Sequence, residues 1–305
     1  MAEAVDRVTA IMIARNEEHS LPISIGHLLN NLRVDQVIVA ENGSTDATRA
    51  VLQRIAQIDG RVRWTDASGP FLQGEIVTDL ARSAYREGAR WILPVDADEF
   101  FVFGKQGFKG VEAAPGVDAF ELDICNFVQF SWVKKDHPRA LEKMVYSVVP
   151  IGAVEAARQL VENRDIAFVQ IDYPRKLLLR GSHSLVIEKG NHGARIEGSR
   201  ARLPQAQILH APLRAADRMT QRRSTGRWLE GRVTGDTSWH LRRLQAYSDD
   251  QLIDEWNANS TYFGLVGPPG RKRRLLFDLR LRRIAISQRS FAASIHLGNP
   301  PKSAA

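Results

Sequence analysis

The chain has 305 residues, a formal net charge of +7 and one cysteine, Cys125, so an internal disulfide framework is excluded and a reducing compartment is indicated. Hydrophobic residues make up 44% and charged residues 25%, as in a globular protein with a sizeable core. The first seven residues lack the apolar run of a signal peptide, and no stretch approaches the roughly 18 apolar residues of a membrane span. We therefore expect a cytoplasmic protein, with a peripheral position on a membrane as the alternative.

Strand-like and helix-like apolar segments alternate over the first hundred residues. Strands are predicted at residues 8–14, 37–40, 61–64 and 91–95. Apolar residues at helical spacing predict helices that begin near Leu21, with Pro22 in the first turn, near Val51 and near Ile76. This alternation predicts an α/β fold with a mostly parallel central sheet, helices on both faces and a helical C-terminal extension.

Polar motifs follow three of the predicted strands. ARNEE at 14–18 follows the first strand, ENGSTD at 41–46 follows the second, and DADEF at 96–100 follows the last. Because the carboxyl ends of parallel strands meet at one edge of a sheet, where open α/β sheets bind ligands, the motifs are expected to form one site.

Asp96 and Asp98 are the strongest candidates for this site. Residues i and i+2 of an extended chain point to the same side, so two carboxylates can converge on a hard divalent cation. The alternative is an acidic strand end in which one aspartate caps the next element.

With these motifs in this order, residues 8–104 resemble family 2 glycosyltransferases of the GT-A fold, closest to a subgroup with a strand-end DADEF. The resemblance continues more loosely to Arg214, through Lys176, GNHG at 190–193 and ILHAPLR at 208–214. It implies transfer of a sugar from a nucleotide-sugar donor to an acceptor hydroxyl, usually with inversion at the anomeric carbon. It also implies a divalent metal, Mn²⁺ or Mg²⁺, that stabilises charge on the leaving diphosphate.

The resemblance gives three residues a role toward the metal. Asp98 would bind the metal directly, and Asp96 would bind it through water or hold the ribose or sugar of the donor. His210, which ends a short apolar run, would supply a third ligand, with a packing role as the alternative. Glu99 would orient a neighbouring carboxylate or lie at the surface.

Four residues match the donor side of the family. Ala14 and Asn16 correspond to donor-pocket positions, and Arg15 would contact the diphosphate or lie in solvent. Glu41 stands where the family usually carries an aspartate that binds the nucleotide base. Its extra methylene displaces the carboxylate by more than about 1 Å, given C–C bond lengths of about 1.5 Å, so uridine recognition does not follow. A turn residue is the alternative for Glu41, and Asp46 is expected to cap the next helix.

Inverting transfer needs a base that takes the proton of the acceptor hydroxyl. The candidates are Glu188 and His192, with Asp136 and Asp172 as outsiders, and a structural role is the alternative for each. Solvation is the default for three further basic residues that could contact phosphate or acceptor, namely Lys176, Arg180 and His183.

The second half of the chain is basic. Residues 1–150 hold 16 basic and 21 acidic residues, a balance of −5, and residues 151–305 hold the remaining 26 and 14, a balance of +12. This predicts an anionic partner. Nucleic acid is not expected, because few aromatic residues are interleaved with the basic ones.

Two basic segments stand out in this half. One comprises Arg214, Arg218, Arg222, Arg223 and Arg227, whose helical spacing predicts either a solvated helix face or a clamp for the diphosphate or an anionic acceptor. The other, 271–283, follows a predicted linker at 264–270 and contains seven basic residues and one acid. It is expected to be a solvated helix or a basic helix that lies on an anionic membrane surface.

Three parts are therefore predicted: a nucleotide-sugar-binding part at 1–130, an acceptor-side part at 131–263 and a basic extension at 264–305. The acceptor would be a glycan or a lipid-linked sugar, as in polysaccharide biosynthesis. A nucleotidyltransferase acting on sugar phosphates is a rival, but residues 15–19 lack the glycines of its phosphate loop. A non-catalytic polyanion-binding module is the third possibility, disfavoured by intact Asp96, Asp98 and His210.

Overall fold

The computed structural model describes residues 3–69, 72–104, 107–151, 154–229 and 239–296. The chain forms two compact units. The first unit comprises Met1–Leu122, Lys176–Ala206 and Ile286–Ala305, and the second comprises Asp123–Arg175 and Gln207–Ala285. The functional boundaries predicted near residues 130 and 263 remain predictions.

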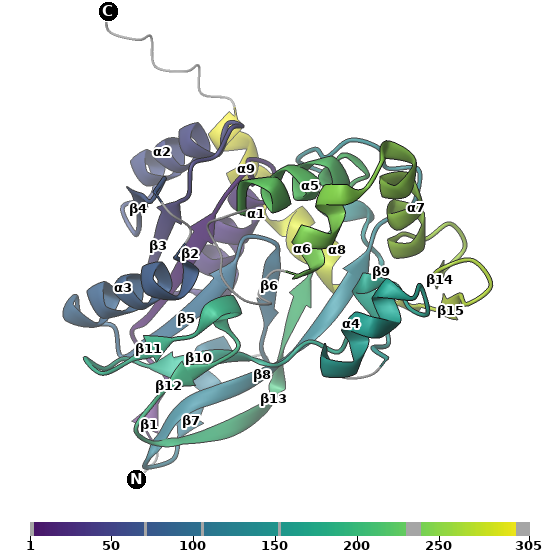
Figure 1. The fold of residues 1–305 in the computed structure, drawn as a ribbon. Coiled ribbons are helices and arrows are strands. Elements are labelled where there is room, and N and C mark those ends of the chain that lie inside the picture. Colours follow the sequence, from purple (N-terminus) through teal and green to yellow (C-terminus); the bar gives the residue numbers. More distant parts are fainter. Residues whose placement is uncertain (1–2, 70–71, 105–106, 152–153, 230–238, 297–305) are drawn as a thin grey trace, which may run out of the picture. The chain divides into compact units, whose positions relative to one another are not determined.

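Four parallel strands form the centre of the first unit. They are β2 (Val8–Ala14), β3 (Gln36–Glu41), β4 (Val62–Asp66) and β5 (Trp91–Asp96), in the order β5-β2-β3-β4 (Figure 1). Beyond β5, the antiparallel strand β10 (Lys176–Arg180) and the first part of β8 (Val117–Val128) extend the sheet. All four predicted strands are confirmed, and so is the α/β class.

The three predicted helices connect these strands. α1 (Leu21–Gly26) begins with Pro22 in its first turn and continues as a π-helix (His27–Leu32). α2 (Thr48–Ile58) follows β3, and α3 (Gln73–Arg86) follows β4. The N-cap residue of α2 is Ala47, not the predicted Asp46, but the Asp46 carboxylate just before it accepts a hydrogen bond from the Thr48 N–H group (2.9 Å).

Both faces of the central strands are buried, as their continuous apolar runs require. The apolar side of α3 packs on one face, where Val77, Leu80 and Ala84 join Ile11 and Ile38 of the sheet in one cluster. α9 (Arg289–His296), near the end of the chain, packs against α1, where Phe291 lies so close to Gly26 that a Cβ atom there would approach its ring to 2.8 Å.

Short elements complete the first unit. They are β1 (Glu3–Ala4), paired with β7 (Glu112–Ala113), β6 (Glu99–Val102), a 3-10 turn (Gly107–Gly110), and β11 (Val186–Ile187), paired with β12 (Ala194–Arg195) across a second 3-10 turn (Lys189–Asn191). β13 (Ser199–His210) leads from the first unit into the second.

The second unit surrounds its own apolar core, which includes Val128, Val169, Leu213 and Trp256. Its strands are the end of β8, β9 (Tyr146–Ser147), β14 (Leu265–Val266), β15 (Arg273–Arg274) and β16 (Leu276–Phe277). Its helices are α4 (Val154–Glu162), α5 (Asp217–Leu229), α6 (Trp239–Arg242) and α7 (Asp249–Asn259), with 3-10 turns at Ala140–Lys143, Phe168–Gln170 and Arg243–Ala246. α8 (Arg280–Ser287) begins here, so the expected helical C-terminal part is present.

The expectations for 264–283 were wrong in two respects. The segment predicted to be a linker contains β14, which pairs with β15 in a hairpin. The helix predicted over 271–283 begins only at Arg280, because β16 pairs with β9 and Leu275 is buried in the core. These tertiary contacts override the helical pattern of the sequence. None of the helices in the described ranges reaches the length and apolarity that crossing a bilayer requires.

The arginine-rich helix is confirmed as α5, but its arginines are not a solvated face. Arg214, just before the helix, is fully buried and pairs with the Asp136 carboxylate (3.0 Å). Arg222 donates to the Pro212 carbonyl and Arg223 to the Tyr247 carbonyl. The side chain of Arg227 lies outside the described part of the chain.

Candidate active site

The three polar motifs of the first unit meet at the carboxyl edge of the parallel strands. Ala14 lies opposite Glu41, Glu41 lies opposite Asp66, and Ile13 lies opposite Asp96. The strand order reverses between β2 and β5, because β3 and β4 continue on one side of β2 and β5 lies on the other. Such a switch point leaves a crevice beyond the strand ends, which is where ligands bind in open α/β sheets.

A tight turn holds the acidic pair at this edge. β5 ends at Asp96, Ala97 and Asp98 form the turn, and β6 begins at Glu99. Glu99 is buried, and its Oε2 atom accepts the Asp96 N–H group at 3.1 Å, so this side chain closes the turn. Asp98 is half-buried at the tip.

Lys176 joins the turn from β10. Its Nζ atom lies 2.7 Å from Oδ2 of Asp96 and 3.2 Å from Oε1 of Glu99. Burial alone would lower the pKa of Lys176, but the two carboxylates more than compensate and hold the pKa above its ordinary value. Lys176 is therefore a buried ammonium in an ion network, and the expectation that it is solvated was wrong.

Asn191 completes the surroundings of Asp96. Its Nδ2 atom donates to Oδ1 of Asp96 at 3.3 Å, so both carboxylate oxygens accept hydrogen bonds from this unit. Asn191 is buried and has a positive φ of 61°, a conformation for which asparagine is among the more tolerant residues. The GNHG motif predicts no separate role for Asn191, because its bond to Asp96 joins residues 95 positions apart in the chain.

The loop that carries Asn191 also carries the two candidate bases. Glu188 is exposed and His192 is half-buried. Gly193 lies so close to Glu188 that a Cβ atom there would approach Oε2 to 2.0 Å. α3 anchors the loop, because Gln73 accepts the Gly190 N–H group (3.2 Å) and Thr78 accepts that of Ile187 (2.9 Å). Of the outsiders, Asp172 is exposed and Asp136 pairs with Arg214, both in the second unit.

Hydrogen bonds join the loops after β2 and β3. Nη1 of Arg15 donates to the carbonyl oxygens of Asn42 and Gly43, each at 2.7 Å. Oδ1 of Asn16 accepts the Thr45 N–H group at 2.7 Å. Arg15 and Asn16 are thus fixed at the sheet edge, next to the buried Ala14.

Glu41 is fully buried at the start of the second loop. One carboxylate oxygen accepts the Ser44 N–H group (2.6 Å), and the other accepts from Arg49 (2.8 Å). Burial alone would raise the pKa of Glu41, but the hydrogen bonds from Ser44 and Arg49 outweigh it and lower the pKa. The carboxylate therefore stabilises the turn, and contact with a nucleotide base stays a prediction.

His210 lies in the second unit, at the end of β13. Asn126 donates from Nδ2 to the Val169 carbonyl (2.9 Å), which turns its Oδ1 atom toward Nδ1 of His210 at 2.8 Å. Nδ1 is therefore the nitrogen that donates to Asn126, and Nε2 is the candidate metal ligand. Histidines that bind metals are commonly oriented by such a bond from the other nitrogen to an oxygen.

The residues present are better suited to a metal that binds together with a diphosphate than to a metal held by protein ligands alone. In the described ranges, no three His, Cys, Asp or Glu side chains are grouped to hold an ion. Both oxygens of Asp96 already accept from Lys176 and Asn191, and Asp98 is the second carboxylate at the tip of the turn. One or two carboxylates plus substrate phosphates is the usual way in which Mg²⁺ is held.

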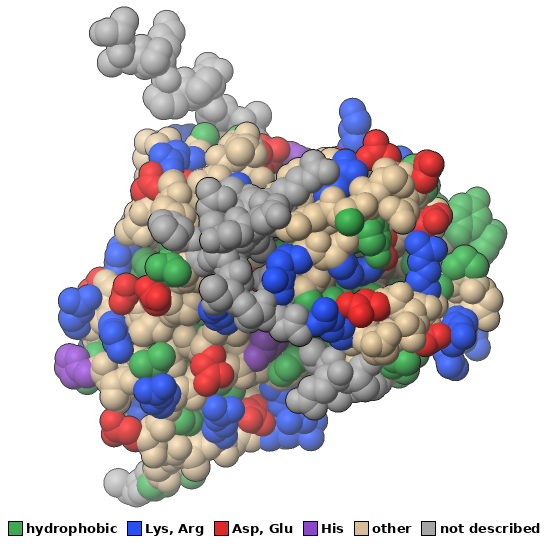
Figure 2. All heavy atoms as spheres, viewed as in Figure 1, with side chains coloured by type: hydrophobic (Ala, Val, Ile, Leu, Met, Phe, Trp, Pro, Cys, Tyr) green, Lys and Arg blue, Asp and Glu red, His purple; other side chains and the backbone are tan. Residues whose placement is uncertain are grey.

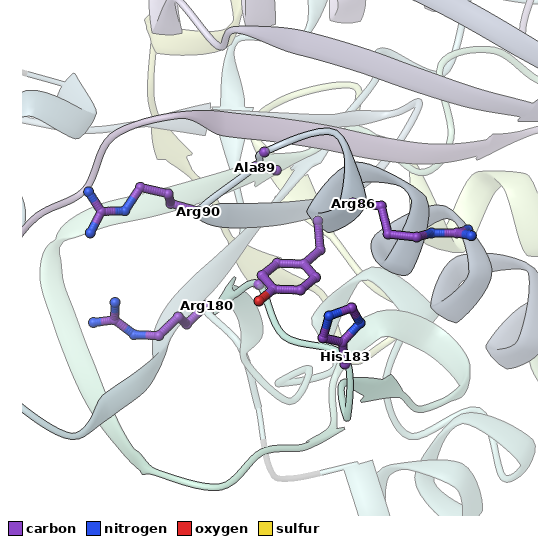
Figure 3. Close-up of a pocket in the computed structure, with 8 residues that line it drawn as sticks. Arg86, Ala89, Arg90, Arg180 and His183 are labelled. Carbon is purple, nitrogen blue, oxygen red and sulfur yellow. The ribbon is translucent and has the colours of Figure 1, made fainter.

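A cavity of about 500 Å³ lies at the other end of β5 (Figure 3). It is lined by Arg86, Arg90, Arg180 and His183, among others, but Arg86 points away from Arg90 and Arg180. Arg180 pairs with Asp118 (3.2 Å), and the expectation of a solvated Arg180 was therefore wrong. Because β5 spans about 17 Å from Trp91 to Asp96, this cavity is not part of the acidic site.

Residues 9–105 match the sequence model of a family described as Glycosyl transferase family 2. This confirms the family resemblance over nearly the same residues on which the motifs place it, and it favours a glycosyltransferase over the rival classes. No curated protein sequence matches the chain.

Several solved structures are similar at low identity. TarS 1–349 of S. aureus is 12% identical, with 83% of this chain and 71% of that chain covered and a TM-score of 0.39. Glucosyl-3-phosphoglycerate synthase from Mycobacterium tuberculosis, in complex with Mg²⁺ and uridine diphosphate, is 19% identical, with 38% and 43% covered and a TM-score of 0.27. The chain thus spans less than half of the mycobacterial enzyme.

The buried ion network predicts a large loss of stability when its cation is removed. Lys176→Met leaves the buried Glu99 without its counter-charge, so we expect the free energy of unfolding in urea to fall by about 3–5 kcal/mol. Lys189→Met, at an exposed lysine, is the control and should change it little. If Lys176→Met is as stable as the control, the network does not hold the turn.

The pairing of Glu41 with Arg49 predicts a pH-dependent effect. Because the pKa of Glu41 is lowered from its ordinary value of 4.5, its contribution to stability is present above that pH and is lost as the pH falls through the lowered pKa. Arg49→Met weakens the cause of the shift, so it should destabilise the protein at pH 7 and less so below pH 4.5. Arg54→Met, exposed on the same helix, is the control in urea unfolding across pH. If the free energy of unfolding of Arg49→Met is lower than that of the parent by the same amount at every pH, this role is contradicted.

Proposed function

We propose, from the premise that residues 9–105 form a family 2 glycosyltransferase domain, that the chain moves a sugar from a nucleotide-sugar donor to an acceptor hydroxyl, with inversion and with a divalent metal. The observation that carries the proposal is the β5–β6 turn. It presents Asp98 beside Asp96 at the switch point between β2 and β5.

The donor would lie across this crevice. Ala14 is small and buried at the end of β2, and Arg15 and Asn16 follow at the edge of the sheet. Arg15 directly follows Ala14, and its guanidinium group is of the type that binds phosphate oxygens. Glu41 would act on the nucleotide base directly or, through the turn that it stabilises, by shaping the base pocket.

Asp98 and His210 would hold the metal, with the donor diphosphate as the other ligand and Asp96 acting through water or on the sugar. A bound Mn²⁺ or Mg²⁺ would neutralise charge on the leaving diphosphate. Imidazole together with carboxylate favours Mn²⁺ or a similar ion over Ca²⁺. Lys176 holds Asp96 in place through an ion pair, so that the donor would meet a preformed turn.

The loop at 188–193 would supply the base. Either Glu188 or His192 would take the acceptor hydroxyl proton while that oxygen attacks the anomeric carbon on the face opposite the diphosphate. Asn191 supports this choice, because it ties the loop to Asp96 at 3.3 Å. A glycan or a lipid-linked sugar is the acceptor class that the family resemblance implies.

The rival functions lack such support. A nucleotidyltransferase would need a glycine-rich phosphate loop after β2. The loop after this strand instead contains Arg15 and Asn16, which are hydrogen-bonded to the loop after β3. A non-catalytic polyanion-binding module would not need a buried lysine that holds an acidic turn at a switch point of the sheet.

The central test is metal-dependent nucleotide binding. Asp98→Ala removes the proposed carboxylate ligand, so we expect affinity for the cognate nucleoside diphosphate in the presence of Mn²⁺ to fall by about 100-fold or more. Isothermal titration with a panel of nucleoside diphosphates, with Mn²⁺ or with EDTA, measures it. Transfer activity should be lost in parallel.

Two controls keep this test specific. Asp98→Asn should keep the melting temperature of the parent, and Asp79→Ala, at an exposed acid of α3, should keep nucleotide affinity. Nucleotide affinity that is the same with EDTA, or the same in Asp98→Ala as in the parent, would refute the metal role of Asp98.

His210 is tested in the same way. If Nε2 binds the metal, His210→Ala should weaken Mn²⁺-dependent nucleotide binding by about 10-fold or more and leave metal-free binding unchanged. His183→Ala, at an exposed histidine, is the control. Equal affinities of His210→Ala and the parent would return His210 to a packing role against Tyr173, whose ring centroid lies 6.0 Å away.

A further inference from the structure

Six aromatic side chains of the second unit form a continuous row, hereafter the aromatic row. In order they are Phe263, Tyr262, Trp132, Phe130, Tyr146 and Phe277, and the centroids of neighbouring rings lie 4.2–5.9 Å apart. The backbone fixes both ends of the row. Phe277 pairs with Tyr146 between β16 and β9, and the Ser131 N–H group donates to the Thr261 carbonyl (2.8 Å).

Much of this row is exposed. The exposed fractions are 81% for Phe263, 67% for Phe277 and 50% for Trp132, and the adjacent Leu276 is 57% exposed. These rings pack on each other and are open to solvent, so they form a contiguous exposed apolar surface. Such surfaces are uncommon on globular proteins and mark binding sites.

Basic residues border the same surface. Arg271, Lys272, Arg273 and Arg274 are exposed in and beside the β14–β15 hairpin, where Leu265 lies opposite Arg274. Green and blue side chains gather side by side in Figure 2 where Figure 1 places this hairpin. Lys134 and Lys135 follow Trp132 and are also exposed.

The positive charge of the hairpin is largely uncompensated. Arg271 pairs with Asp165 (2.5 Å), but within the described ranges no acid lies at ion-pair distance from Lys272, Arg273 or Arg274. The neighbouring acid Asp278 is itself held by Arg280 (2.7 Å). The surface therefore offers apolar rings together with an excess of cations.

We propose that the aromatic row and the β14–β15 hairpin bind the surface of an anionic lipid bilayer. Phe263, Phe277 and Leu276 would enter the headgroup region, while Lys272, Arg273 and Arg274 would meet lipid phosphates. The charge excess favours a bilayer over a neutral glycan, and so do phenylalanine and leucine, which lack the hydrogen-bonding edge of a sugar platform. This proposal does not depend on the proposed enzyme activity.

Vesicle flotation of the full chain tests the proposal. We expect binding to vesicles of equimolar phosphatidylcholine and phosphatidylglycerol at low salt, and much weaker binding to phosphatidylcholine alone. Changing Lys272, Arg273 and Arg274 to Gln together should lower the partition coefficient by about 100-fold, at roughly tenfold or less per charge. The pair Phe263→Ser and Leu276→Ser should lower it by about 10-fold or more at any salt concentration.

Matched variants elsewhere give the controls. The charge control changes three exposed arginines, Arg33, Arg54 and Arg86, to Gln and so removes the same charge. The apolar control combines Ile58→Ser with Ile253→Ser and so removes two other exposed apolar side chains. The proposal is overturned if the controls lose as much binding as the test variants. It is also overturned if the parent does not float with the vesicles. A third contradicting result is that the parent binds neutral oligosaccharides and that only the Phe263→Ser, Leu276→Ser variant loses this binding.

Discussion

One buried ammonium group organises the candidate site. Lys176 lies between Asp96 and Glu99, and it gives the buried Glu99 a counter-charge that solvent cannot provide there. Glu99 in turn closes the backbone of the β5–β6 turn, and Asn191 ties the loop that carries the candidate bases to the other oxygen of Asp96. The position of Asp98 thus follows from an ion network that reaches across three segments far apart in the sequence. A network of this kind is costly to break, which makes the turn rigid before any ligand arrives.

The sheet decides where this rigid turn acts. β2 has β3 on one side and β5 on the other, and ligands of open α/β sheets bind beyond the strand ends at such a switch point. Arg15 and Asn16 border it from β2, and Asp96 borders it from β5. A diphosphate placed there would meet an arginine on one side and an acidic turn on the other, and the proposed metal would lie between the turn and the phosphates.

Local patterns were enough to predict the strands, the helices of the first hundred residues and the convergence of the three motifs, since each rests on periodicity or on the parallel arrangement of the strands. The burial of Lys176 could not be predicted, because its partners are 80 residues away and a lone lysine in an apolar strand gives no signal of an ion pair. The helix predicted over 271–283 failed for a related reason. Pairing of β16 with β9 and burial of Leu275 are tertiary effects that outweigh an amphipathic pattern. Chain folding also places Phe277 at one end of the aromatic row and Tyr262 and Phe263 at the other, a surface that no linear motif reveals.

Crystals grown with Mn²⁺ and the cognate nucleoside diphosphate, measured at a wavelength where manganese scatters anomalously, give the most direct test of the account. We predict a single anomalous peak at coordination distance from a carboxylate oxygen of Asp98 and from the diphosphate. Asp96 should still be bound to Lys176, and the nucleotide should lie over the ends of β2 and β5. A manganese peak away from Asp98, or a nucleotide bound away from this edge of the sheet, would contradict the account.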